Sequence, residues 1–152
     1  MKRIYALSAV VTLFVLLFSS CNKIPVGYLN TKDAVFTPDS IFVSRNIDPE
    51  SPRAKNGAPW TSLQIQGISG TNPINYEFSS VKVSEGGDAA KFEEIVKAGH
   101  VSAEGGVVKI FQEGIKIIPN GNYTLSLRAY NEGHSHILKD IITFVVRDNI
   151  EE

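Results

Sequence analysis

The chain has 152 residues, with 15 Lys and Arg against 16 Asp and Glu and a formal net charge of −1. This length suits one domain with a sizeable core and is short for two. The basic residues form no cluster, which argues against nucleic acid as a partner. The sequence holds a single cysteine, so a disulfide within the chain is excluded.

Residues 1–20 have the order of a secretory signal. Two basic residues precede the apolar segment 4–18, and the small residues Ser19 and Ser20 precede Cys21. As a helix the apolar segment would reach about 22 Å, which is short of the roughly 30 Å hydrocarbon core of a bilayer. The pattern predicts a cleaved signal peptide, with an uncleaved N-terminal helix as the alternative.

The run Leu17-Phe18-Ser19-Ser20-Cys21 resembles the lipobox of bacterial lipoproteins. In that family a diacylglycerol is attached to the cysteine sulfur and the chain is cut before that residue. The resemblance implies lipidation of Cys21 and an anchor in the outer membrane, on a side that the sequence leaves open. A lipidated Cys21 would also leave the chain without a free thiol for catalysis or metal binding.

After the cysteine, residues 21–33 combine polar residues with Pro25 and Gly27 and show no hydrophobic period, which predicts a lipidated tether. From residue 34 to 148 the apolar residues alternate in short runs separated by Gly, Pro and Asn, as in a β-sandwich. The strand candidates are residues 40–44, 61–66, 74–79, 107–111, 123–130 and 141–146. A loop is expected at 48–59, one short helix at 89–98 with Gly99 after it, and a tail at 149–152.

The alternation also predicts the core. In the run 61–66, Leu63 and Ile65 point inward and the glutamines outward. The expected core residues are Ile41, Leu63, Ile65, Tyr76, Phe78, Phe92, Ile110, Tyr123, Leu125, Leu127, Ile142 and Phe144.

The segment from Gly121 to Gly133 resembles the last hairpin of cadherin-like and related Ig-like domains. Those domains often have Gly-x-Tyr-x-Leu there, followed by Asn or Asp and Gly in the turn. The resemblance implies an all-β, Ig-like/cadherin-like Greek-key sandwich of about seven strands with one short helix. The spacing of Gly121 and Tyr123 also fits a tyrosine corner, in which the phenol hydroxyl forms a hydrogen bond with the backbone a few residues upstream.

Calcium is not expected, although cadherins bind it. The turn at 67–70 that matches their calcium site has no acidic residue, whereas calcium needs several oxygen ligands, mostly from carboxylates. No cofactor is predicted either. His134 and His136 could share a strand face, but a third ligand is not visible and a hairpin turn is expected there. No catalytic motif occurs, so the chain is predicted not to be an enzyme.

A lipid-anchored sandwich of this kind resembles accessory lipoproteins of polysaccharide-uptake systems in Gram-negative bacteria. Sugar rings stack on exposed aromatic side chains, which makes Trp60 and Tyr130 the candidate ligand-binding residues. For Trp60, a place in the core or as a lid over it is the alternative. The predicted function is therefore non-enzymatic binding at the outer membrane, with glycan capture as its specific form. The alternative is a structural or adhesive module that joins an outer-membrane protein partner through an edge strand.

Overall fold

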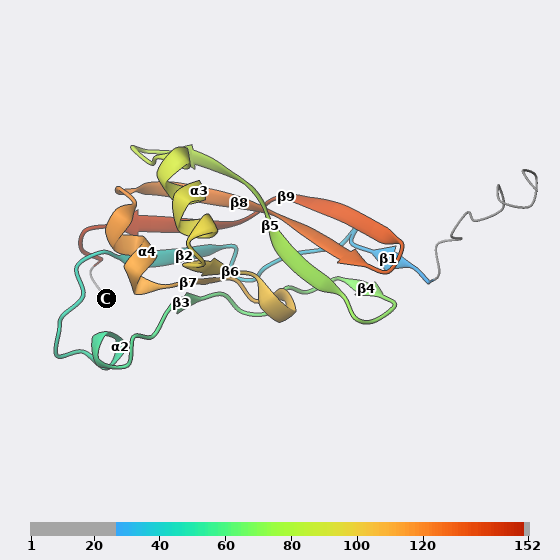
Figure 1. Cartoon of the computed structure of the whole chain (residues 1–152), viewed down its shortest axis with the longest axis horizontal. Helices are drawn as coiled ribbons and strands as arrows, with labels where there is room; N and C mark the ends of the chain where they lie inside the picture. The colour runs from blue at the N-terminus through green and yellow to red at the C-terminus, as the bar shows by residue number, and fades with distance from the viewer. Residues whose placement is uncertain (1–26, 151–152) are drawn as a thin grey trace, which may run out of the picture.

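The computed structural model describes residues 27–150, and most of the elements in that range are strands (Figure 1). The largest sheet has four strands in the order β2, β9, β8, β5. These are β2 (Ser40–Ser44), β5 (Asn75–Ser84), β8 (Gly121–Asn131) and β9 (His134–Arg147). β8 pairs antiparallel with both of its neighbours, whereas β2 pairs parallel with β9. The prediction of a mainly β fold is confirmed; Cys21 and the predicted signal lie outside the described residues.

Two smaller sheets complete the strands of the described range. The three-stranded sheet has the order β3 (Trp60–Thr61), β7 (Lys109–Ile110), β6 (Val101–Ser102). A short ribbon pairs β1 (Leu29–Asn30) with β4 (Ser69–Gly70). Leu29 is buried, so strand pairing already begins inside the segment 21–33 that the sequence assigned to a tether.

The described residues contain three α-helices, where the sequence predicted one. They are α2 (Pro52–Lys55), α3 (Ala89–Lys97) and α4 (Gln112–Ile117), together with the 3-10 turn η1 (Glu104–Gly106). α3 is the predicted helix: Asp88 caps its first turn and Gly99 follows it with φ +80°. α4 has no side-chain N-cap, which is why its sequence carries no start signal.

A bulge in β5 reconciles its sequence with a single buried face. Tyr76 and Phe78 face the core before the bulge, and Val81 and Val83 pack against it afterwards. Ser79 is the extra residue between them, since Phe78 pairs with Leu127 while Ser80 already pairs with Ser126. Without it, the one-residue change in spacing would turn the two valines to solvent.

The core lies between the four-stranded and three-stranded sheets, with α3 and α4 beside it (Figure 1). Phe92 of α3 stacks on Tyr123 at 5.1 Å between ring centroids and approaches Phe78 at 5.9 Å. Most of the predicted core residues are buried: Ile65, Phe92, Ile110, Tyr123, Leu125, Leu127, Ile142 and Phe144. Ile41, Tyr76 and Phe78 are half-buried and pack against this cluster.

The prediction for Leu63 was wrong, because its side chain is 61% exposed. The strand ends at Thr61, and Ser62 turns inward instead. The Ser62 hydroxyl accepts the backbone N–H of Val108 at 2.9 Å and donates to the Leu63 carbonyl at 2.7 Å. These two hydrogen bonds hold Ser62 inward and break the alternation, so that Ile65 is buried and Leu63 is not.

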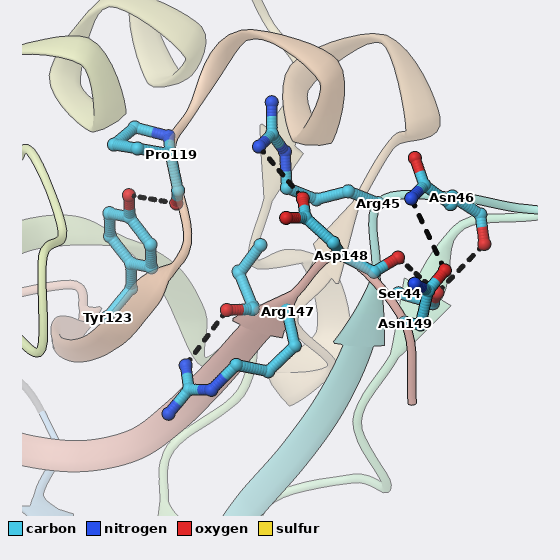
Figure 2. A network of polar contacts seen from close by, with 9 residues as sticks. Ser44, Arg45, Asn46, Pro119, Tyr123, Arg147, Asp148 and Asn149 are labelled. Carbon is cyan, nitrogen blue, oxygen red and sulfur yellow. Dashed lines mark hydrogen bonds and ion pairs between the residues drawn. The ribbon is translucent and has the colours of Figure 1, made fainter. Parts of the chain in front are cut away.

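The tyrosine corner is confirmed. The Tyr123 hydroxyl donates to the Pro119 carbonyl oxygen at 2.7 Å (Figure 2) and accepts the N–H of Asp88 at 3.3 Å. One phenol thus joins the start of β8 to the N-cap of α3. Burial raises the pKa of Tyr123, and burial likewise raises that of Tyr76.

The two ends of the molecule differ in what they carry. Residue 27 and β1 lie at the end formed by the β8–β9 turn, where Asn131 Nδ2 donates to the carbonyls of Tyr28 at 2.8 Å and Thr71 at 2.9 Å. α2, α4 and the last described residues lie at the opposite end (Figure 1). The 11-residue strand β8 alone spans roughly 35 Å between these ends.

Candidate functional site

A cleft of about 580 Å³ opens at the end of the molecule that carries α2. One wall is β2 with the last described residue, Ile150, and the other is the loop 46–51 with Arg53 and Trp60. We call this the Trp60 cleft. Its apolar side chains are Phe42, Ile47, Trp60 and Ile150, and its polar ones are Ser44, Asn46, Asp48, Ser51 and Arg53.

The two aromatic residues of the cleft differ in exposure. Trp60 is only 6% exposed and belongs to the core cluster, with the Arg53 guanidinium carbon 5.0 Å from its ring centroid. It is therefore a lid over the core that also borders the cleft. Phe42 is 62% exposed, because it lies between the inward-facing Ile41 and Val43 on β2. The open aromatic surface of the cleft is thus the Phe42 ring.

Hydrogen bonds fix the loop that forms the outer wall. The Ser51 hydroxyl accepts the Ala54 N–H at 3.2 Å and caps α2. The buried Gln112 side chain donates to the carbonyls of Arg53 at 2.7 Å and Ala58 at 3.1 Å. Gln112 opens α4, so this amide ties the loop to the body of the protein. This wall of the cleft is therefore held in place by hydrogen bonds at both ends of α2.

The opposite wall is fixed where β2 and β9 end (Figure 2). Arg45 Nη1 lies 3.2 Å from Asp148 Oδ1, and Asn46 Nδ2 donates to Asn149 Oδ1 at 3.3 Å. The backbone N–H of Asn46 also donates to the Asp148 carbonyl at 2.9 Å. These contacts extend the β2–β9 pairing beyond the strands and carry the chain to Ile150 at the rim of the cleft.

The charges of the lining balance. Asp48 is its acid and Arg53 its base, and both are already engaged: Asp48 accepts the Glu50 N–H at 2.9 Å, and Arg53 donates to the Pro59 carbonyl at 2.9 Å. The remaining polar groups are hydroxyls and an amide. Such a lining suits a neutral ligand with hydroxyl groups and an apolar face, because no net charge has to be matched.

Tyr130 is not part of this cleft. It lies on β8 near the β8–β9 turn, half-buried, with the Arg128 guanidinium carbon 4.2 Å from its ring centroid. Arg128 Nε donates to Glu77 Oε1 at 2.6 Å, and this bond lowers the pKa of Glu77. The two candidate aromatics therefore do not form one site. Within residues 27–150, no three His, Cys, Asp or Glu residues are grouped so as to hold a metal.

Sequence reasoning did not single out Phe42 or Gln112. For Phe42 the signal was present, since an aromatic residue on the outward side of an alternating strand is an exposed aromatic. For Gln112 there was none, because its partners Arg53 and Ala58 are more than 50 residues away in the chain.

No family model, curated protein or solved structure matches this chain. The helices of the described range are all too short or too polar to cross a bilayer.

Proposed function

We propose that this chain is a lipid-anchored, non-enzymatic binding protein that captures glycans in the Trp60 cleft. The observation that carries the proposal is the exposed Phe42 ring inside a cleft of balanced charge and hydroxyl groups. A sugar ring presents a C–H face to an aromatic ring and hydroxyls to polar neighbours. Phe42 would supply the stacking surface. Ser44 Oγ, Asn46 Oδ1 and Asp48 Oδ2 would accept hydrogen bonds from sugar hydroxyls, beside the bonds that these side chains already make within the chain.

The proposed anchor is the lipid on Cys21, in the outer membrane. The chain from Cys21 to Gly27 spans at most roughly 20 Å when fully extended. β1 lies at the end of the domain opposite α2 (Figure 1), and α2 contributes Arg53 to the cleft. A lipid at Cys21 would therefore hold β1 near the membrane and display the cleft on the far side of the domain.

For the fold, we propose an Ig-like, cadherin-like Greek-key sandwich. The sheets of four and three strands support this assignment, as does the parallel pairing of β2 with the last strand, β9. The tyrosine corner at Tyr123 is a further supporting feature, since it occurs at the matching strand of Ig domains.

Affinity gel electrophoresis against a panel of neutral polysaccharides tests glycan capture. The binding variant is Phe42→Ala, and the matched control is Leu63→Ala, since Leu63 is exposed to the same degree but does not line the cleft. We expect at least one polysaccharide to retard the wild type and the control, with about tenfold weaker retardation of Phe42→Ala, the equivalent of about 1.4 kcal/mol. Unchanged mobility across the panel would remove the proposal.

The anchor has its own test. Cys21→Ser removes the sulfur that would carry the lipid. We expect the wild type in the membrane fraction, released only by detergent, and the variant in the aqueous fraction. Equal partition of the two proteins would contradict lipidation at Cys21.

A second candidate function, assembly with a protein partner through an edge strand, is supported by the difference between the two edges of the large sheet. β5 is protected by a bulge and by Lys82, which lies 3.9 Å from Asp140. β2, at the other edge, has no charge, proline or bulge and exposes Phe42. An edge of this kind is an open template for another strand. A partner that co-purifies in constant ratio with the wild type, and not with Phe42→Asp, is the expected result.

A further inference from the structure

The geometry points to a second copy of this chain as the occupant of the β2 edge. We propose that two copies pair antiparallel through β2, about a twofold axis at Phe42, and join their four-stranded sheets into one. The inference rests on the edge-strand role proposed above and does not require glycan capture.

The backbone of β2 has hydrogen-bonding groups free for this pairing. The Asp39 carbonyl accepts the Thr143 N–H at 2.8 Å, and the Arg45 N–H donates to the Arg147 carbonyl at 2.8 Å. Odd-numbered residues of this strand thus direct their backbone groups at β9. Successive residues alternate in direction, so Ser40, Phe42 and Ser44 direct theirs at the free edge. Within the described part of the chain, no strand pairs with that edge.

The sequence of β2 is symmetric about Phe42. Moving outward, Ile41 mirrors Val43 and Ser40 mirrors Ser44. In antiparallel pairing about Phe42, each of these residues faces its mirror position in the partner. The side chains that meet are therefore two phenylalanines, β-branched residues and serines, all of which are compatible across strands. A twofold interface requires this kind of self-complementary surface.

The charges at the two ends of β2 are also complementary. Asp39 and Arg45 stand at equal distances from Phe42, so each Asp39 would face Arg45 of the other copy. Asp39 is exposed, and Arg45 uses only one guanidinium nitrogen, Nη1, for its pair with Asp148. Its Nε is buried, so Nη2 is the nitrogen left to donate to a second carboxylate. Two opposite-charge pairs would flank the strand pair and select the antiparallel register over a shifted one.

The pairing is short, since β2 has five residues, and it belongs to the small, transient class of interfaces. Dimerisation should therefore be measured on the full chain in detergent by sedimentation, at protein concentrations up to the order of 0.5 mM. We expect concentration-dependent dimers of the wild type. Asp39→Lys should raise the dissociation constant at least tenfold, because it places a lysine opposite the partner's arginine.

Disulfide crosslinking tests the register directly. In a hydrogen-bonded antiparallel pair the two Phe42 Cα atoms would be about 5.5 Å apart, within the range that a disulfide spans. Phe42→Cys in membranes treated with a mild oxidant should form a dimer that reductant reverses. The controls are the wild type, which reports any crosslinking through Cys21, and Lys82→Cys at the exposed β5 edge.

Two results would overturn the inference. Crosslinking of Phe42→Cys no greater than that of Lys82→Cys, with a monomer throughout the concentration range, would exclude pairing at β2. A disulfide that joins Phe42→Cys to a different protein would exclude self-pairing while preserving the edge-strand role. Neither result bears on the binding of a short oligosaccharide to a single cleft, so the failures of the two proposals are distinguishable.

Discussion

Tyr123→Phe isolates the contribution of the tyrosine corner to stability. The substitution removes one oxygen atom and keeps the ring, so the stacking on Phe92 is retained and no large cavity forms. It removes the hydrogen bond to the Pro119 carbonyl and leaves the Asp88 N–H without its acceptor. Each such bond contributes about 1 kcal/mol net, so we expect a loss of about 2 kcal/mol in the free energy of unfolding.

Equilibrium urea denaturation measures this loss as a lower midpoint with an unchanged slope. Tyr130→Phe is the matched control: its hydroxyl makes no hydrogen bond within residues 27–150, and we expect a change within about 0.5 kcal/mol. A loss for Tyr123→Phe no larger than that of the control would refute the claim that the hydroxyl joins β8 to α3.

Three further predictions concern the core, the cleft wall and pH. Ile65→Ala should lower the free energy of unfolding, measured by heat or urea, by about 2–5 kcal/mol, and Leu63→Ala by less than about 0.5 kcal/mol, because only Ile65 is buried. Equal losses would mean that both side chains face the core, as in an alternating strand, and would contradict the structure. Gln112→Ala should lower the free energy of unfolding by about 1–3 kcal/mol and speed amide hydrogen exchange in residues 51–58, because the Gln112 side chain joins this segment to α4. Unchanged exchange in residues 51–58 would show that the Gln112 hydrogen bonds do not hold the segment. Burial raises the folded-state pKa values of Tyr76 and Tyr123 above the unfolded value of about 10, so the unfolding free energy should fall as pH rises above about 10. The fall should be smaller in Tyr123→Phe than in the wild type, because the variant has one raised tyrosine pKa fewer. An equal fall in the wild type and the variant would contradict the raised pKa of Tyr123.

Local patterns predicted the elements whose signals lie within a few residues. The α3 helix followed from the spacing of its apolar residues and from Gly99, and β2 was predicted with the observed bounds. The role of Tyr123 followed from its place at the start of a long alternating strand. In each case the residues that cause the structure are neighbours in the chain.

The remaining features depend on partners that are distant in sequence. Because Ser62 turns inward to bind Val108, Leu63 points to solvent instead of the core, and no residue near position 62 predicts that hydrogen bond. The parallel pairing of β2 with β9 joins residues about 100 positions apart. The Trp60 cleft likewise arises because Gln112 and the Asp148 network hold two separate segments in place. A cleft built in this way has no sequence signature, although the exposed Phe42 side chain could be predicted from the alternation of β2.

The proposals for this surface combine at the β2 strand. Phe42 lines the cleft and is also the centre of the proposed dimer, so self-pairing would bring two clefts into one assembly. A polysaccharide long enough to reach both would bind more tightly to the dimer than to one cleft, since the second contact is intramolecular. Asp39→Lys should then weaken binding of a polymer and leave binding of a short oligosaccharide unchanged.

The most direct test of glycan capture uses the only tryptophan of the chain, which lies in the cleft. Because Trp60 borders the cleft, a ligand bound there should change the surroundings of its ring, so the wild type is titrated with oligosaccharides of any polymer that retards it in a gel. We expect a saturable change in Trp60 fluorescence, with a midpoint about tenfold higher in Phe42→Ala and unchanged in Tyr130→Ala. Retardation by a polymer whose fragments leave Trp60 fluorescence unaltered, and whose binding survives Phe42→Ala, would contradict it.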